Sequence, residues 1–178
     1  LQHISTSILG SMQRGIDKDG TLKLMQQFKD NLPDVAIRTA LIVGYPNETE
    51  QDFEELKDFV TSMRFDRLGV FQYSAEEGTP SFALGDTVSD EEKQRRMDEI
   101  MYLQERISIE KNSEKVGKEY TVLVDRKEGD FWVGRTEYDS PEIDNEVLIQ
   151  TDKRLKVGEF YKVEITDAME YDLMARLV

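Results

Sequence analysis

Residues 35–53 read VAIRTALIVGYPNETEQDF, which is the pattern of a strand, a turn and a helix start in direct succession. Residues 35–43 are mostly apolar at odd and even positions alike, as in a parallel strand that is buried on both faces. The glycine, proline and asparagine within residues 44–47 are typical of a turn. Thr49, followed by Asp52 three residues later, forms a capping-box pattern that opens a helix. This stretch therefore predicts one βα unit.

The sequence on either side of this unit has the same alternation. Apolar residues 68–71 predict a second buried strand. Four helices are expected: one capped by Ser5 that stops at Gly15, one from about Thr21 to Pro33, one from Thr49, and a long one from a capping box of Ser89 and Glu92. Strands alternating with helices indicate an α/β domain with a parallel sheet. Because two strands and four helices do not complete such a domain, we interpret residues 1–113 as the second half of a (β/α) barrel.

From about residue 115 the apolar residues alternate as in half-buried strands. Five short strands are expected, at residues 120–124, 131–136, 146–149, 161–165 and 173–178, with turn residues between them. Five strands in this length favour a small closed barrel of the oligonucleotide-binding kind. The sequence thus predicts two domains, an α/β domain over residues 1–113 and an all-β domain over residues 114–178.

Composition excludes several kinds of site. The 178 residues contain no cysteine and one histidine, His3, so thiolate or multi-histidine metal sites and cysteine nucleophiles cannot form within them. No apolar run is long enough for a membrane span or a signal peptide, and the cytoplasm is the expected compartment. The chain carries 37 acidic and 23 basic residues, for a net charge of −14. A strongly acidic surface favours basic partners.

Ligands of α/β folds bind at the carboxyl ends of the strands, on the loops that follow them. Those loops are residues 44–49 and 72–80 here. Both are also rich in residues that a strand-to-helix turn needs for structural reasons alone, because glycine and proline make turns and Thr49 caps a helix.

Several motifs in this order carry a resemblance to a known family. Residues 41–53, residues 1–5 with 12–15, and residues 65–80 resemble the radical S-adenosylmethionine methylthiotransferases. The stretch 65–80, FDRLGVFQYSAEEGTP, resembles the branch that modifies an aspartate of a small-subunit ribosomal protein more than the branch that modifies tRNA. Residues 116–118, 134–136, 141–144 and 168–173 are similar to the C-terminal TRAM domain of that branch.

This resemblance implies a C-terminal portion of an enzyme that methylthiolates the β-carbon of an aspartate. Family members use S-adenosylmethionine and two 4Fe-4S clusters, each held by three cysteines. Neither cysteine motif is present in these residues, so the chain alone is expected to be inactive, with no catalytic residue and no metal ligand of its own. The chain would begin where the fourth strand of the barrel ends.

The resemblance also assigns residues to the cofactor. Gly44 would let the backbone approach the nucleoside, Val43 and Phe71 would contact the adenine, and Gln2 and Arg14 would bind the methionine carboxylate or the substrate edge. Each residue has a structural alternative: Val43 and Phe71 as core residues, Gly44 as a turn residue, and Arg14 as the partner of a helix dipole.

Four further residues are candidates for substrate binding. Glu48, Glu76 and Glu77 lie on the two loops, where they form either a solvated rim or a surface for a basic substrate. Trp132 is either a core residue of the barrel or an exposed anchor. His3 is expected to be packed or hydrogen-bonded rather than to bind a ligand.

Three functions compete: a protein methylthiotransferase, a tRNA methylthiotransferase, and a binding module that acts through its barrel. A nucleic-acid-binding barrel should cluster its lysines and arginines. Residues 114–178 instead have 16 acidic and 10 basic residues scattered along the sequence. A basic small-subunit ribosomal protein is therefore the expected partner, and tRNA is less expected. The apolar strand at 35–43, without a neighbour on one edge, is also expected to promote self-association.

Overall fold

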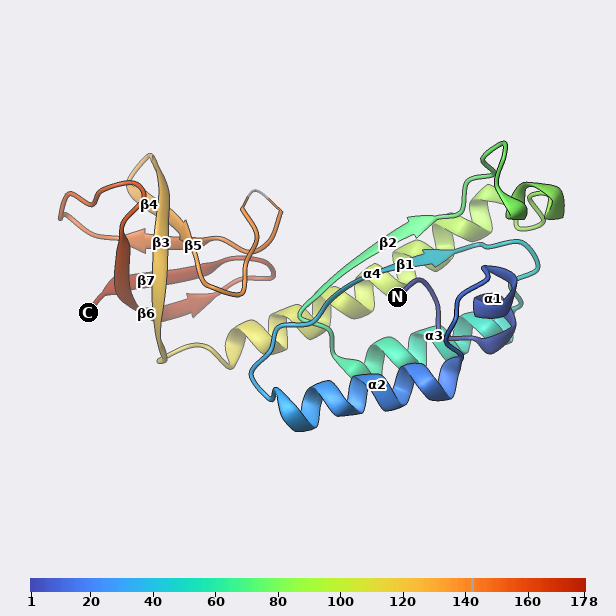
Figure 1. Ribbon diagram of the computed structural model, residues 1–178. Helices are drawn as coiled ribbons and strands as arrows, with labels where there is room; N and C mark the ends of the chain where they lie inside the picture. The colour runs from blue at the N-terminus through green and yellow to red at the C-terminus, as the bar shows by residue number, and fades with distance from the viewer. Residues whose placement is uncertain (142) are drawn as a thin grey trace. The chain divides into compact units, whose positions relative to one another are not determined.

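The computed structural model describes residues 1–141 and 143–178 (Figure 1). It contains two compact units, Leu1–Gln104 and Glu105–Val178, which we describe separately. The predicted boundary between residues 113 and 114 coincides with the end of α4 (Asp90–Ser113), a helix that contributes residues to both units. The position of the domain boundary stays a prediction.

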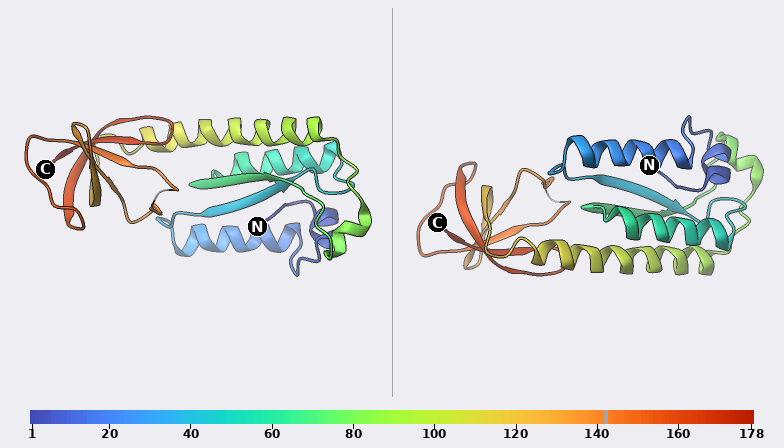
Figure 2. Two further views of the ribbon diagram at one scale, coloured as in Figure 1. Left: turned by 90° about the horizontal axis from the view of Figure 1, so that it is seen from above. Right: turned by 90° about the horizontal axis from the view of Figure 1, so that it is seen from below.

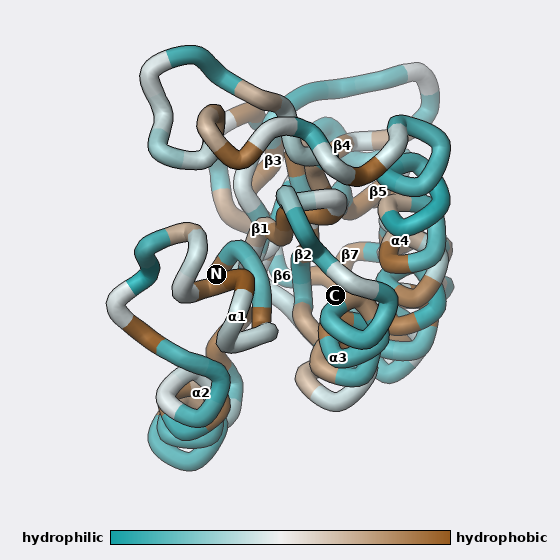
Figure 3. Tube along the Cα trace, turned by 90° about the vertical axis from the view of Figure 1, so that its right-hand side faces the viewer, coloured by the Kyte–Doolittle hydropathy of each residue, from teal (hydrophilic) through white to brown (hydrophobic). Residues whose placement is uncertain are grey.

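The first unit has the predicted order of elements. It contains α1 (Thr6–Ser11), α2 (Lys18–Asn31), β1 (Arg38–Val43), α3 (Glu50–Met63), β2 (Arg67–Gln72), a short 3-10 helix η1 (Pro80–Leu84) and the first part of α4. The two strands are parallel and run side by side in both views of Figure 2, with Ile42 opposite Phe71. Helices α2, α3 and α4 follow one another around one side of the strands (Figure 3). The predicted α/β architecture with a parallel strand pair is confirmed.

The two strands are not buried on both faces, as the sequence had led us to expect. Along β1, Thr39, Leu41 and Val43 are buried, whereas Arg38 and Ala40 are exposed. In β2 the side chain of Phe71 is 60% exposed. The helices cover one side of the pair (Figure 3), and on the other side Ala40 and Phe71 are exposed and Ile42 is partly buried.

Several predicted element starts are wrong. β1 begins at Arg38 rather than Val35, because the backbone N–H of Ile37 donates to Asp66 Oδ2 over 2.8 Å instead of entering the strand ladder. Helix α2 begins at Lys18 rather than near Thr21, because the Asp17 side chain accepts from Gly20 N and caps an earlier turn. Its expected inward face is also incorrect in part, since Phe28 and Leu32 are exposed.

Ser5 does not cap α1 with its side chain. Its hydroxyl donates instead to Asp52 Oδ1 on α3. Asp52 also completes the predicted capping box with Thr49, in which each residue's side chain accepts from the other's backbone N–H. The Asp52 carboxylate thus takes part in the N-terminal cap of α3 and also accepts a hydrogen bond from Ser5, just before α1.

The second unit contains the five predicted strands, which close into a barrel. These are β3 (Glu119–Glu128), β4 (Phe131–Arg135), β5 (Val147–Gln150), β6 (Phe160–Ala168) and β7 (Leu173–Leu177), in the order β3-β4-β5-β7-β6. Alternate residues of the strands fill the barrel core, among them Val122, Ile149 and Leu173. Gly134 allows β4 to approach β3 closely, because a Cβ there would collide with the carbonyl of Leu123.

The C-terminal turn of α4 is fixed to the barrel by Asn112. This buried side chain donates from Nδ2 to the carbonyls of Met169 and Glu170, each at 3.2 Å. Of the stretch 141–144, which carried part of the resemblance, residue 142 lies outside the described residues. Within the described part of the chain, no helix combines the length and the apolar character needed to cross a membrane.

Candidate functional site

The carboxyl ends of β1 and β2 carry a cluster of aromatic side chains. Tyr45 follows β1 and Tyr73 follows β2, and their rings meet edge to face with centroids 5.2 Å apart. Ile8 and Met12 from the α1 region and Ile42 from β1 pack against them. The Tyr45 hydroxyl donates to the carbonyl of Ser11 over 3.2 Å, which ties α1 to this end of the strands.

Two of the predicted cofactor residues bond to each other here. Arg14 donates from its guanidinium to Gln2 Oε1. The carbonyl of Gln2 in turn accepts from the backbone N–H of Ile42 over 2.8 Å, so the N-terminal segment runs beside the end of β1. Ile42 lies opposite Phe71 in the strand register. The structure therefore brings Gln2, Arg14 and Phe71 to one region, at the carboxyl end of the strands.

Val43 does not join this group. Its side chain is fully buried, and it lies opposite Gln72 in the register, so it points to the face that Phe71 does not share. Val43 and Phe71, which were both expected to contact the adenine, thus lie on opposite faces of the strand pair. Ile42 lies on the same face as Phe71 and is partly exposed. Strand alternation could have identified Ile42, had the sequence shown which face is open.

Gly44 is required by the turn and by its packing. Its φ is +73°, in the left-handed region that favours glycine. A Cβ at Gly44 would also collide with the side-chain stem of Lys93, which comes from α4. Lys93 is buried and its Nζ donates to Asp86 and Asp90. Burial alone would lower the pKa of Lys93, but the hydrogen bond and the charge of Asp86 raise it above the usual value.

The structure places Glu48, a predicted substrate-binding residue, in the interior of the first unit. Its side chain is completely buried, and its Oε2 accepts from the backbone N–H of Tyr45 over 3.0 Å. Its Oε1 lies 3.3 Å from Arg96 Nη1 and 3.7 Å from His3 Nε2. A carboxylate enclosed in this way shapes the loop after β1 and is out of reach of a substrate. The expectation that His3 is packed is confirmed by its complete burial.

Glu76 and Glu77 lie on the loop after β2, and both are exposed. Glu76 accepts from Ser74 Oγ over 3.2 Å, and neither carboxylate forms an ion pair within the described residues. The loop that runs from Tyr73 to Ser89 contains no lysine or arginine. Its base is held by the Lys93–Asp86 pair and by a hydrogen bond from Asn47 N to Thr87 Oγ1 over 2.7 Å.

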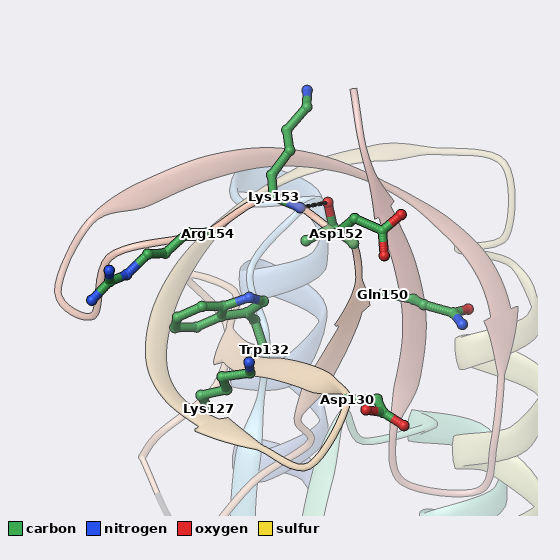
Figure 4. Close-up of a pocket in the computed structure, with 8 residues that line it drawn as sticks. Lys127, Asp130, Trp132, Gln150, Asp152, Lys153 and Arg154 are labelled. Carbon is green, nitrogen blue, oxygen red and sulfur yellow. Dashed lines mark hydrogen bonds between the residues drawn. The ribbon is translucent and has the colours of Figure 1, made fainter.

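Trp132 is a core residue that also lines a pocket on the barrel (Figure 4). Its side chain is 9% exposed. The pocket has a volume of about 1010 Å³, and its lining consists of Lys127, Asp130, Trp132, Gln150, Thr151, Asp152, Lys153 and Arg154. Sequence reasoning missed the three basic residues, which lie at the end of β3 and in the turn after β5 and meet only when the barrel closes.

The first unit therefore presents Gln2, Arg14 and Phe71 near the carboxyl end of its strands, and the second unit has a pocket of its own. Neither region offers a metal centre, since no group of three or more histidine, cysteine, aspartate or glutamate side chains is placed to hold a metal among the described residues. A cluster held by cysteine thiolates does not fit these residues at all, because the chain has no cysteine.

Comparison with known proteins gives consistent results for both units. Residues 116–178 match the TRAM domain family. The whole chain is 52% identical to ribosomal protein uS12 methylthiotransferase RimO of Phocaeicola vulgatus, of which it covers 42%. It is 55% identical to the protein of that name from Flavobacterium psychrophilum over 97% of this chain and 40% of the relative. The corresponding protein of Christiangramia forsetii is 52% identical over 97% of this chain and 39% of the relative. The chain thus spans about two fifths of the length of the relatives it matches.

Proposed function

We propose that this chain is part of an enzyme that methylthiolates the β-carbon of an aspartate in a small-subunit ribosomal protein. The chain belongs to the radical S-adenosylmethionine methylthiotransferases and corresponds to the C-terminal part of their ribosomal-protein branch. The observation that carries this proposal is the similarity of the entire chain to proteins named for uS12 methylthiotransfer. A TRAM domain alone would also suit the tRNA branch, so the first unit, which is included in these matches, favours the ribosomal branch. The proposal places the chain in the cytoplasm.

Within that enzyme, the first unit would hold S-adenosylmethionine at the open face of its strands. The Arg14 guanidinium beside Gln2 suits the methionine carboxylate. The exposed ring of Phe71, with Ile42 beside it in the register, suits the flat face of the adenine. Gly44 contributes through the shape of the turn, and Val43 supports the strand from the opposite face.

S-Adenosylmethionine and two 4Fe-4S clusters would supply the radical and the methylthio group when bound in the whole enzyme. This chain's residues fit the first of these groups and do not fit the clusters. We therefore propose that the chain binds and orients S-adenosylmethionine, and that it is inactive when it is alone. Its own part in the reaction is to position the cofactor and to admit the substrate.

The substrate would approach over the loop after β2. Glu76 and Glu77 are exposed, lack cationic partners within the described residues, and lie on a loop without basic residues. Such a surface attracts a basic protein, as ribosomal proteins are, and raises its rate of association at low salt. Asp86 on the same loop is already paired with Lys93 and contributes less.

A chimaera tests the function directly. The corresponding C-terminal part of the Phocaeicola vulgatus relative is replaced by this chain, and the chimaera is supplied with uS12 and, separately, with tRNA. Mass spectrometry then measures methylthio groups on each substrate. We expect modification of uS12 at an aspartate and none on tRNA.

A chimaera that modifies tRNA instead would establish the tRNA branch. A folded chimaera with its clusters in place that modifies neither substrate would leave the chain as a binding module. A Glu76→Lys/Glu77→Lys variant of the chimaera is expected to raise the KM for uS12 with little change in kcat, whereas Glu114→Lys/Glu137→Lys, an equal charge change at exposed residues of the second unit, serves as the control.

A further inference from the structure

The short helix η1, in the loop after β2, leaves its apolar side chains exposed. Phe82 is 45% exposed and Leu84 is 41% exposed, and none of the five residues of η1 is buried. The similarly short helix α1, by contrast, buries Ile8 and Leu9. In Figure 1 this segment is the green loop with a short helix that follows the end of β2. Two large apolar side chains of η1 thus face solvent rather than the core of the first unit.

The loop is shaped by hydrogen bonds that do not involve these two side chains. Thr79 donates from Oγ1 to the carbonyl of Glu76 over 2.7 Å, and the N–H of Phe82 donates to the carbonyl of Thr79 over 3.1 Å. Gly85, at a φ of +72°, ends η1 in a conformation that favours glycine. Because the backbone of the loop is held in this way, the side chains of Phe82 and Leu84 are available to a partner.

The loop is also fixed to the carboxyl end of the strand pair. At its start, the N–H of Tyr73 donates to the carbonyl of Val43 over 2.9 Å. At its end, Thr87 Oγ1 accepts from the N–H of Asn47, on the loop after β1, over 2.7 Å. Ligands of parallel α/β folds bind at this end of the strands. The loop that carries η1 therefore borders the region where the cofactor is proposed to bind.

The charge of the loop restricts the kind of partner that can contact these apolar side chains. Residues 73–89 include three acidic residues and no lysine or arginine. Asp86 pairs with Lys93. The exposed Glu76 and Glu77 form no ion pair within the described residues. These carboxylates repel the phosphates of a nucleic acid, whereas a basic polypeptide with an apolar side chain between its cations matches both the charge and the apolar surface.

We propose that residues 74–86, which we call the docking loop, select a protein substrate over RNA. Phe82 and Leu84 receive an apolar side chain of the substrate, and the two exposed glutamates pair with the lysines or arginines beside it. This inference rests on the proposed function, because it takes a basic ribosomal protein to be the substrate. It adds that recognition requires an apolar anchor as well as charge, as is usual where a few side chains dominate an interface.

Binding of purified uS12 to the full chain tests the docking loop without any need for catalysis. Biolayer interferometry measures the affinity at low and at high salt. Phe82→Gln/Leu84→Gln should weaken binding about ten-fold at both salt concentrations, because the lost contacts are apolar. Glu76→Gln/Glu77→Gln should weaken binding at low salt and much less at high salt, because salt screens exposed charges.

Helix α2 of the same unit offers a matched control. Leu24 and Phe28 are the same two residue types, and each is 39% exposed. Leu24→Gln/Phe28→Gln should therefore change the affinity for uS12 less than about two-fold. A polylysine peptide, which has the positive charge and lacks the apolar anchor, should compete with uS12 only at low salt.

Four results would overturn the proposal. The first is that uS12 does not bind the parent chain, and the second is an equal loss of affinity in the η1 variant and the α2 control. The third is full competition by polylysine at high salt, which would leave the apolar anchor without a role. The fourth is that Phe82→Gln/Leu84→Gln weakens the binding of tRNA as much as that of uS12, because the docking loop would then not select protein over RNA.

The chimaera separates this proposal from the proposed function. There, Phe82→Gln/Leu84→Gln should raise the KM for uS12 about ten-fold and leave the KM for S-adenosylmethionine and the iron content unchanged. A fall in iron content or thermal stability would show that the remainder of the enzyme covers these side chains. That result would overturn the docking loop, while modification of uS12 by the parent chimaera would still support the proposed function.

Discussion

His3 Nε2 lies 3.7 Å from Glu48 Oε1, and both side chains are completely buried. His3 Nδ1 accepts from the backbone N–H of Ser5 over 3.0 Å, which directs the other ring nitrogen toward the carboxylate. Arg96 on α4 approaches the same Oε1 and also donates to the carbonyl of Glu48. One carboxylate therefore joins the N-terminal segment, the loop after β1 and α4, and these three segments surround the end of the strands where the cofactor is proposed to bind.

This arrangement predicts a large effect of Glu48→Ala on stability. The change removes the carboxylate from a buried guanidinium and leaves the backbone N–H of Tyr45 without its acceptor. Loss of one partner of a buried ion pair costs about 3 kcal/mol in free energy of unfolding. Urea unfolding followed by far-UV circular dichroism measures it. Glu77→Ala, on an exposed residue, is the control and should stay within about 0.5 kcal/mol of the parent chain. Equal stability of the two variants would contradict a structural role for Glu48.

The second prediction concerns acid. Burial alone would raise the pKa of Asp52, but hydrogen bonds from Ser5, Thr49 and Ser7 lower it to about 2. A carboxylate whose pKa is lower in the folded state stabilises the fold above its unfolded value, near 3.8, and this contribution disappears as the pH falls toward 2. Asp52→Asn should therefore cost on the order of 1 kcal/mol at neutral pH, allowing for solvent screening of a partly exposed group. The difference between parent and variant should shrink between pH 4 and pH 2, as measured by urea unfolding. A difference that does not change over this range would assign the effect to lost hydrogen-bond geometry rather than to charge.

The barrel could be predicted in detail because the alternation of residues along each strand shows which side chains face the core. Inward and outward residues alternate within a few positions, as in Val122 and Val124 on β3, and turns separate the strands. Residues 35–43 lack that alternation. Ala40 and Ile42 are as apolar as Leu41 and Val43, so the sequence did not show that only one face is covered. For the same reason the sequence does not distinguish Ile42, on the open face, from Val43, on the covered one.

The errors at the candidate site have a similar origin. A glutamate on a loop is usually solvated, and the burial of Glu48 depends on His3 and Arg96, which lie far away in the sequence. The basic pocket likewise depends on barrel closure, which brings Lys127 near Lys153 and Arg154. Long-range pairs of this kind leave no periodic signal, whereas helices and strands do.

The third prediction separates backbone strain from packing at Gly44. Gly44→Ala should cost about 1 kcal/mol for the left-handed φ and a further cost for the collision with Lys93. Gly78→Ala is a matched control in the same unit, because Gly78 has a φ of +83° with nothing near an added Cβ. In a Lys93→Ala background the two alanine changes should become equally costly. A thermodynamic cycle on urea unfolding measures the coupling, and additive costs would contradict the close approach of Lys93.

The fourth prediction tests which strand face binds the cofactor. In the chimaera, Phe71→Ala should raise the KM for S-adenosylmethionine about five-fold, as expected for loss of one aromatic contact. Arg14→Met should raise it about ten-fold, because a charge-assisted hydrogen bond is lost. Val43→Ala should leave the KM unchanged and lower thermal stability, since Val43 is buried on the opposite face. A KM raised equally by Val43→Ala and Phe71→Ala would contradict the assignment of the open face.

The last prediction concerns the exposed edge and face of β1. Among the described residues, β2 is the one strand that pairs with β1, and on the other edge of β1 the Gln2 carbonyl accepts from Ile42 N. The apolar side chains of Val35 and Phe71 are exposed beside it. Unpaired strand edges with exposed apolar residues tend to associate, so we expect the isolated chain to form dimers or larger species as its concentration rises. Val35→Lys/Ala40→Lys places two charges on this surface and should return the sedimenting mass to that of the 20.6 kDa monomer. A Thr121→Lys/Thr166→Lys variant, which adds the same charge at exposed positions of the barrel, should associate like the parent chain. Sedimentation of the parent chain as a monomer at every concentration would show that the Gln2 contact and the flanking residues already protect this edge.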